Sequence, residues 1–349
     1  MKRVYFFLAL LASFSGIEAQ TKVEKFNPGV VAEGVNYALP KTALKIQVVA
    51  TKTTFTPGEF GRYAERYLHL NNVKTEAEVK WEIKSIKVST YGVPDMNKVY
   101  TIKLKDKSIA PFVRLSDEGL IKGINAEANV ASDAVEVPAP VVNKLSGRKY
   151  LTEEILSANS RSKMAELTAG EIYAVRESKN SITRGEADAM PKDGNSLQIV
   201  LQSLDEQEKA LMQLFTGKTE QESVVETFTL APDADVEKEV AFRFSSKLGL
   251  VDNDDLSGEP YYVSVKNLHS VPVPTEEEKK KRKIEGVVYN MPGMAEVKLF
   301  NSSSTIYSED LPFGQFGAED VLMSALFNKN ATTKVTFSTV TGGLLKIDQ

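Results

Sequence analysis

The sequence predicts an α+β protein in which mainly antiparallel, β-rich N-terminal and C-terminal parts flank a helical hairpin. From Gly34 to Asn125, apolar residues tend to recur at every second position and are interrupted by turn residues, which is typical of half-buried strands. Two segments between 160 and 217 carry apolar residues at helical spacing, and strand patterns return after them. The predicted units are a leader at 1–19, a β-rich part with a linker at 20–147, a helical hairpin at 148–217 and a second β-rich part at 218–349.

The clearest strand runs from Val79 to Val88, where apolar and polar residues alternate. A break in this alternation between Lys84 and Ile86 predicts a β-bulge. The residues predicted on apolar faces are Val79, Trp81, Ile83, Ile86 and Val88. Further strands are predicted at Leu44–Thr51, Val99–Leu104, Phe112–Leu115 and Leu120–Asn125, with a hairpin turn at Ser116–Gly119 and a short helix after Pro57-Gly58 that buries Tyr63, Ala64, Tyr67 and Leu68.

Two longer helices are predicted to form the hairpin. The first, Ser160–Glu177, is expected to bury Met164, Leu167, Ile172 and Val175. The second, Asn195–Phe215, is expected to bury Leu197, Val200, Leu201, Leu204, Leu211, Leu214 and Phe215 and to end in a left-handed Gly217. The flanking predictions are an extended linker at 126–147 and strands at Ser223–Leu230, Val240–Phe244 and Tyr261–Val265.

A short internal echo relates the two β-rich parts. Glu33–Pro40 recurs as Glu285–Pro292, and each is followed by G-x-F-G, at Gly58–Gly61 and at Gly314–Gly317. The echo predicts a repeated unit of a strand, a proline turn, a second strand and a short helix. The alternative is a coincidence between two unrelated strand and turn segments.

The N-terminus has the features of a secretory signal peptide. Lys2 and Arg3 precede the apolar run Val4–Leu11, which is too short to span a bilayer comfortably. Small residues follow, and cleavage is predicted between Ala19 and Gln20. We therefore expect export to the periplasm or the cell envelope, with no membrane span after the leader is removed.

The composition excludes several kinds of site and ligand. The formal net charge of -4 gives no general attraction to nucleic acid. The chain has no cysteine, which excludes disulfides, thiolate metal sites and the acylated cysteine of a lipoprotein, so no lipid anchor is expected. Stability must therefore come from packing and hydrogen bonding.

No motif assigns a catalytic residue, a cofactor or a metal. His69 and His269 have no partner at metal-ligand spacing, and neither a G-x-S-x-G elbow nor a phosphate-binding loop is present. The acidic run Asp252–Glu259 invites a calcium interpretation, but Leu256 stands where an EF-hand loop needs an oxygen ligand. A solvated turn is the favoured interpretation.

The polar stretch between the two long helices is the candidate binding surface. Its Pro191–Gly194 segment predicts a turn that presents charged side chains. The alternative is that these charges pair with one another and fix the hairpin geometry. The candidate residues are Arg176, Glu177, Arg184, Glu186, Asp188, Lys192 and Asp193. The run Glu276–Lys283 is predicted to be a solvated charge run.

Turn and cap motifs spread over most of the chain carry a family resemblance. They are Gly185–Asp188, Pro191–Gly194, Leu214–Gly217, Tyr289, Pro292-Gly293, Gln315–Gly317 and Thr341-Gly342. With these motifs the chain resembles an uncharacterised family of exported Bacteroidota proteins, a domain of unknown function. The resemblance implies a shared fold rather than a shared activity. Asn290-Met291 departs from it, since a basic residue is expected before Pro292.

These observations predict an exported, non-enzymatic binding or assembly component of the bacterial cell envelope, whose partner is another envelope protein. The alternatives are a periplasmic hydrolase, which needs a cleft with converging ionisable groups, and a glycan-binding protein. Four aromatic residues near the first short helix favour core packing over a glycan platform: Phe55, Phe60, Tyr63 and Tyr67.

Export is expected to require the leader, because its charge and apolar core are what the translocation machinery recognises. Intact-mass measurement of the protein from the envelope fraction should give a chain that starts at Gln20. A released soluble protein that still carries Met1–Ala19 would contradict the prediction.

Overall fold

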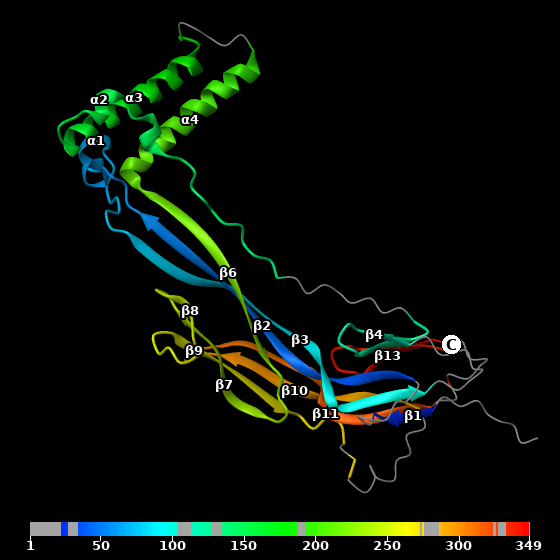
Figure 1. Cartoon of the computed structure of the whole chain (residues 1–349). Coiled ribbons are helices and arrows are strands. Elements are labelled where there is room, and N and C mark those ends of the chain that lie inside the picture. The colour runs from blue at the N-terminus through cyan, green and yellow to red at the C-terminus, as the bar shows by residue number, and fades with distance from the viewer. Residues whose placement is uncertain are drawn as a thin grey trace, which may run out of the picture.

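The protein is an elongated α+β molecule in a computed structural model, with three antiparallel sheets and a helical head at one end (Figure 1). This confirms the predicted fold class. The structure describes residues 22–26, 34–103, 113–126, 135–187, 193–272, 274–275, 286–323, 326 and 333–348. The predicted leader and the Glu276–Lys283 run lie outside the described residues.

Each sheet is named here by its size or position. The long sheet consists, in spatial order, of β1 (Lys22–Lys25), β3 (Glu78–Lys103), β2 (Val35–Thr56) and β6 (Lys218–Leu230). The second sheet consists of β11 (Thr305–Met323), β10 (Gly286–Phe300), β9 (Glu259–Asn267), β7 (Val236–Ser245) and β8 (Gly249–Val251). The small sheet consists of β13 (Leu344–Asp348), β12 (Lys334–Phe337), β5 (Ile121–Ile124) and β4 (Val113–Leu115). The head contains 3-10 turns at Gly61–Tyr63 and Gly147–Tyr150 and the helices α1 (Ala64–Leu68), α2 (Glu153–Leu156), α3 (Arg161–Arg184) and α4 (Gly194–Thr216).

Three separate hydrophobic cores follow one another along the molecule. The end core joins β1, the start of β2 and the end of β3 to the small sheet and includes Tyr37, Ile102, Ile121, Val287 and Phe337. The middle core lies between the long and second sheets and includes Leu44, Ile46, Val48, Phe242, Val265 and Val297. The head core includes Phe60, Leu68, Ile155, Ile172, Leu211 and Phe215.

A neck connects the head to the rest of the molecule. It consists of the paired strand ends Lys52–Thr56, Glu78–Trp81 and Lys218–Glu222. The Trp81 N–H donates to the Ser246 carbonyl at 2.8 Å, and a Cβ on Gly249 would lie 2.8 Å from the Trp81 ring. Glycine is therefore needed where the second sheet meets the base of the neck.

Two local features of the N-terminal strands are as predicted, although β3 joins the separate strands predicted at Val79–Val88 and Val99–Leu104 into one. Val49 pairs with Ser85 while Ala50 pairs with Ile83, so Lys84 is the extra residue of a bulge. β4 and β5 form the predicted hairpin, closed by the Ser116 N–H bonded to the Leu120 carbonyl. One placement is wrong: Val79 is 44% exposed, because it lies in the neck where no second sheet covers it.

The two long helices are confirmed, with corrected ends. α3 continues to Arg184, where Gly185 adopts the left-handed conformation at φ 74° and ψ 22°. Its last two turns were missed because they are largely polar. Gly217 has φ 79° but ψ −175°, so it is not a left-handed cap. The extended ψ leads the chain directly from α4 into β6.

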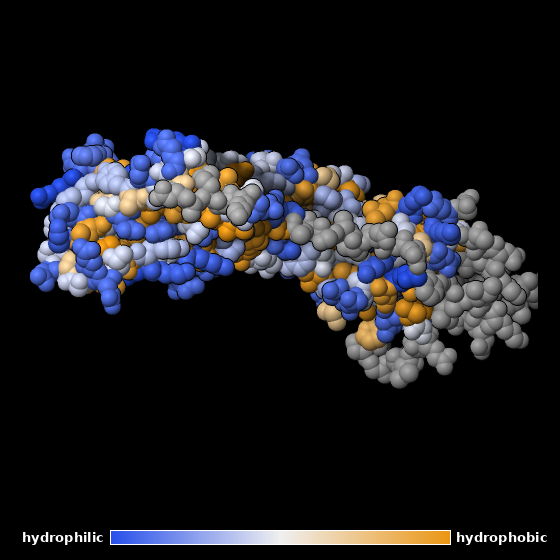
Figure 2. Space-filling model, turned by 90° about the horizontal axis from the view of Figure 1, so that it is seen from above, coloured by the Kyte–Doolittle hydropathy of each residue, from blue (hydrophilic) through white to orange (hydrophobic). Residues whose placement is uncertain are grey.

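The first half of α4 is less buried than predicted. Val200 is 37% exposed, and Leu197, Leu201 and Leu204 are only half-buried. The head core forms where α1, α2 and both 3-10 turns pack against the other end of the hairpin, and among the described residues no core residue comes from the first half of α4. Over the head end of the molecule, hydrophobic residues lie between hydrophilic ones at the surface (Figure 2).

The first half of the internal echo has a structural counterpart. A Cβ on Gly34 would meet the Ile102 carbonyl of β3, and a Cβ on Gly286 would meet the Leu322 carbonyl of β11. Both hairpins shift register beside the proline of the echo, between Ala38 and Pro40 in β2 and between Met291 and Gly293 in β10.

The second half of the echo is not repeated. Gly58–Gly61 leads into the head, as expected, and the Phe60 ring contacts Phe215 at 5.5 Å between ring centroids. Gly314–Gly317 instead lies inside β11 at the register shift with β10, between Phe313, which pairs with Gly293, and Ala318, which pairs with Met291, and it is followed by more strand. The two β-rich parts are also interleaved: β6 pairs with β2, and β12 pairs with β5.

Stability should respond differently to truncation at the two ends of α4. Leu211→Ala should lower the free energy of unfolding by about 2–5 kcal/mol, because Leu211 is fully buried in the head core. Leu201→Ala should cost about 1 kcal/mol or less, since that side chain remains partly in water. Urea unfolding measures both variants. Equal losses would show that the distal half of the hairpin is as well packed as the head core.

Candidate functional site

The candidate site lies where the head joins the neck, and an extended segment crosses it. This segment, the strap, comprises residues 135–146 and enters the head at Gly147. Val141 forms two backbone hydrogen bonds with Gln221 of β6, at 2.9 and 3.0 Å. A Cβ on Gly147 would lie 2.3 Å from the Ala210 carbonyl of α4, so glycine allows the strap to pass close to the helix.

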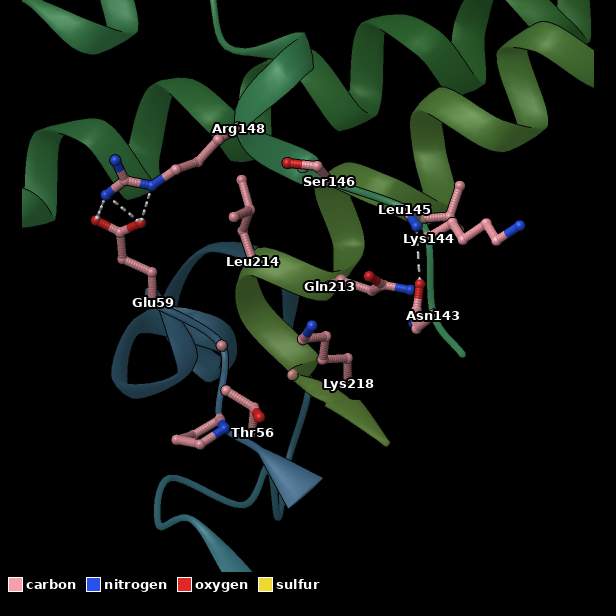
Figure 3. Close-up of a pocket in the computed structure, with 14 residues that line it drawn as sticks. Thr56, Glu59, Asn143, Lys144, Leu145, Ser146, Arg148, Gln213, Leu214 and Lys218 are labelled. Atoms are coloured by element: carbon pink, nitrogen blue, oxygen red, sulfur yellow. Dashed lines mark hydrogen bonds and ion pairs between the residues drawn. The ribbon is translucent and has the colours of Figure 1, made fainter. Parts of the chain in front are cut away.

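The junction pocket is a cavity of about 390 Å³ on one side of the strap (Figure 3). Arg148 and Glu59 form a bidentate ion pair on its wall, with nitrogen to oxygen distances of 2.8–3.0 Å. The Glu59 side chain is 18% exposed and that of Arg148 is 65% exposed. The pair therefore ties the residues before the first 3-10 turn to the end of the strap.

A second pocket, the interhelix pocket, has a volume of about 510 Å³ and is lined by the strap, α3, α4 and the start of β6. The two pockets share five lining residues, Asn143, Leu145, Gln213, Gly217 and Lys218. Leu145 and Met212 supply apolar lining to this second pocket, and charged residues of α3 and α4 and polar residues around the start of β6 also line it. The strap therefore contributes lining residues to both pockets.

An alternating ion network joins α3 to α4 beside the interhelix pocket. Arg176 donates to Glu208 at 2.6 Å, Lys179 donates to Glu208 at 3.0 Å, and Lys179 also pairs with Asp205. Burial disfavours the charge on Glu208, but the two cationic donors outweigh it and hold the pKa of that carboxyl below its usual value. The hydrogen bond from Lys179 likewise lowers the pKa of Asp205.

The candidate binding residues do not gather into one cluster. Arg176 belongs to the ion network, and Glu177 is exposed on α3. Arg184 and Glu186 are 4.0 Å apart at the exposed end of the hairpin. Asp193 caps α4 by accepting from the Ser196 N–H at 2.9 Å, and this contact, with the Ser196 hydroxyl, lowers its pKa. Asp188 and Lys192 lie outside the described residues.

Sequence reasoning missed most of the ion network and the Glu59–Arg148 pair. A signal existed for the network, because Lys179 lies three positions after Arg176 and Asp205 lies three before Glu208. Each pair therefore lies on one face of its helix. Lys179 is five residues before the end of α3 and Asp205 is eleven residues after the start of α4, so the spacing alone does not place the two pairs opposite each other. No comparable signal links Glu59 to Arg148, which are 89 positions apart.

The acidic loop Asp252–Glu259, which was considered above as a calcium site, is held by hydrogen bonds from other residues of the chain. Arg243 donates to the carbonyls of Asn253 and Gly258, and Asp255 accepts from the Ser257 N–H at 2.8 Å. Within the described ranges, no group of three or more His, Cys, Asp or Glu residues is placed to hold a metal ion.

The fold and the site define a class of elongated α+β protein with a helical head carried on a three-stranded neck. A family model described as "Domain of unknown function (DUF4831)" matches residues 33–345, so the chain belongs to this family. No curated protein and no solved structure matches the chain. Among the described helices, none has both the length and the apolar character needed to cross a membrane.

The α3–α4 ion network should make the head sensitive to acid. The pKa of Glu208 is lower in the folded than in the unfolded chain, so its stabilising contribution is complete above about pH 4.3. That contribution is lost as the pH falls through the folded pKa. Glu208→Gln should lower the free energy of unfolding at pH 7 by about 1–2 kcal/mol. The variant should also lose less stability than the parent as the pH is lowered.

Urea unfolding at a series of pH values between 7 and 3 measures this effect. Glu177→Gln is the matched control, since Glu177 is exposed on the same hairpin, and its profile should follow the parent. If Glu208→Gln loses as much stability as the parent when the pH is lowered, the ion network makes no measurable contribution to the acid sensitivity of the head.

Proposed function

We propose that the chain is an exported, non-enzymatic binding or assembly component of the bacterial cell envelope, and that its partner is another envelope protein. The leader pattern of Lys2, Arg3 and Val4–Leu11 supports export. The chain contacts its partner through the helical head.

The observation that carries this proposal is the position of the head. Figure 1 shows it at one end of the molecule, beyond the region where the two large sheets pack together. The head has its own core, and only the neck strands and the strap connect it to the sheets. This arrangement presents a rigid helical surface away from the body of the protein.

Partner contact is assigned to the end of the hairpin where α3 finishes. Glu177 and Arg184 are exposed on a helix already ordered in the free protein, and Glu186 is exposed just after its Gly185 cap. Binding through ordered side chains avoids much of the entropy cost of fixing a flexible loop. Charged rim residues of this kind contribute mainly to specificity and to the rate of association.

Charge reversal at this surface tests the proposal. The variant Glu177→Lys with Arg184→Glu keeps the net charge and should reduce capture of cross-linked envelope proteins by the tagged chain at least tenfold. The melting temperature should stay within about 2 °C of the parent, because exposed charges contribute little to stability. Cross-linking in intact cells followed by mass spectrometry measures the capture.

The matched control is Glu239→Lys with Lys247→Glu, which exchanges an exposed charge on β7 with one in the turn that follows this strand. The control should capture partners as well as the parent does. If no envelope protein is enriched over an unrelated exported protein, the proposed function is wrong. If both double variants capture equally, the function stands and the contact surface is elsewhere.

A further inference from the structure

Among the described residues, the outer edge of β6 has no neighbouring strand over most of its length. On its inner side, β6 pairs with β2 from Lys218 to Leu230 without a shift in register. On its outer side, the only backbone partner within the described residues is Val141 of the strap. In Figure 1 the strap moves away from β6 with increasing distance from the head.

The bridge to Val141 fixes which backbone groups face outward. Both hydrogen bonds of the bridge use the N–H and the carbonyl of Gln221, so these groups point away from β2. Backbone groups alternate in direction along an antiparallel strand. Because the register with β2 is unbroken, the groups of Ser223, Val225, Thr227 and Thr229 also point outward. The edge therefore offers four donors and four acceptors to a new strand.

The open stretch lacks three common forms of edge-strand protection. Exposed edges are commonly blunted by proline, lysine or a bulge. From Ser223 to Leu230 the sequence has no proline and no lysine, and its pairing with β2 has no bulge. By contrast, the strap carries Pro138 and Pro140, whose nitrogens have no hydrogen to donate. β6 is thus able to accept a strand of several residues.

The acidic side chains of β6 specify the charge of that strand. Glu222 and Glu226 are exposed and lie on one face of the sheet, four positions apart. Cationic side chains four positions apart on a neighbouring strand would lie beside both. A second copy of β6 centred on Glu226 would instead place like charges directly opposite each other, which is destabilising. The edge therefore favours a partner of different sequence.

We propose that the β6 edge from Ser223 to Thr229 is a second binding site, which takes an extended segment of a partner protein with Lys or Arg at two positions four residues apart. The segment pairs with β6 as an antiparallel strand, on the same side of β6 as Val141. This inference goes beyond the proposed function and does not depend on the head contact.

Amide hydrogen exchange with a synthetic probe tests the site directly. The probe is the blocked peptide Val-Thr-Val-Lys-Val-Thr-Val-Lys, whose Val residues fall opposite the outward groups from Thr229 to Ser223 and whose Lys residues fall opposite Glu226 and Glu222. Exchange is followed by NMR on the mature protein. Without probe, the outward amides of Ser223, Val225, Thr227 and Thr229 should exchange fast. At saturating probe they should slow at least tenfold. The amides of Val224, Glu226 and Phe228 should be slow throughout, because they bond to β2.

Two control peptides separate strand addition from general attraction. A peptide with Glu in place of both Lys residues should bind at least tenfold more weakly. A peptide N-methylated at the alternate residues that face β6 should not protect the amides. Equal binding of all three peptides, or no protection by the probe, would refute the proposal. So would protection of the same amides in the free protein with evidence of dimers, which would identify the occupant as a second copy.

Variants of β6 supply an independent test. Thr227→Pro removes one outward N–H and leaves the ladder to β2 intact, so it should weaken probe binding at least tenfold, whereas Thr227→Ala should not. Glu222→Lys with Glu226→Lys keeps every backbone group and should reverse the preference, so that the Glu peptide binds better. A charge-reversed double variant with unchanged preference would contradict the proposed recognition even if Thr227→Pro fails to fold.

Discussion

The backbone ladder along β2 is the constraint on which the whole molecule depends. β2 has 22 residues, which span about 70 Å at a rise of about 3.3 Å per residue. Tyr37 lies in the end core, Ile46 lies in the middle core, and Thr56 is the last residue before the head. β3 pairs with one side of the strand and β6 pairs with the other over its second half. Any motion of the head against the body must therefore bend three hydrogen-bonded strands.

A group of side-chain hydrogen bonds, here called the polar crossing, lies between the end core and the middle core. It is formed by the amide side chains of Asn290 and Gln315. The Asn290 side chain is 1% exposed, and its Nδ2 donates to the Pro40 carbonyl at 3.1 Å and to the Thr341 carbonyl at 2.8 Å. Gln315 donates to the carbonyls of Thr42 and Pro232 and accepts from the Thr42 N–H. Buried amides joined in this way fix the relative positions of segments distant in sequence.

The same crossing accounts for a departure noted in the sequence. A basic residue is expected before Pro292 by resemblance, and the chain has Asn290-Met291 there. Cβ atoms built on Gly314 and Gly342 would each lie less than 3 Å from the Asn290 Nδ2, so the space around this side chain is fully used. A lysine or arginine at 290 would bring a buried charge with no carboxylate among these contacts, which is costly. The short neutral amide is the side chain that fits.

The sequence predicts features that depend on neighbours in the chain. The Lys84 bulge, the Ser116–Gly119 hairpin and both long helices follow from local periodicity and turn chemistry. It does not predict pairings across long separations, such as β6 with β2, because every half-buried strand carries a similar alternating pattern. Exposure in the first half of α4 was missed for a related reason. An apolar stripe records which face is apolar, not how many neighbours cover it.

The head and the β6 edge are coupled by one residue of unusual conformation. Gly217 stands between the end of α4 and the start of β6, and its φ of 79° is strained for any residue with a side chain. The space that a Cβ would need is occupied by the Thr56 carbonyl at 2.5 Å and by the Phe55 ring. The last turn of α4 therefore lies directly against the end of β2, and helix and strand continue into each other without a flexible linker. Since the strap bonds to β6 at Gln221 and enters the head at Gly147, a strand added to the outer edge would end beside the head. A ligand on β6 and a partner on the head would then act on the same short, rigid connection.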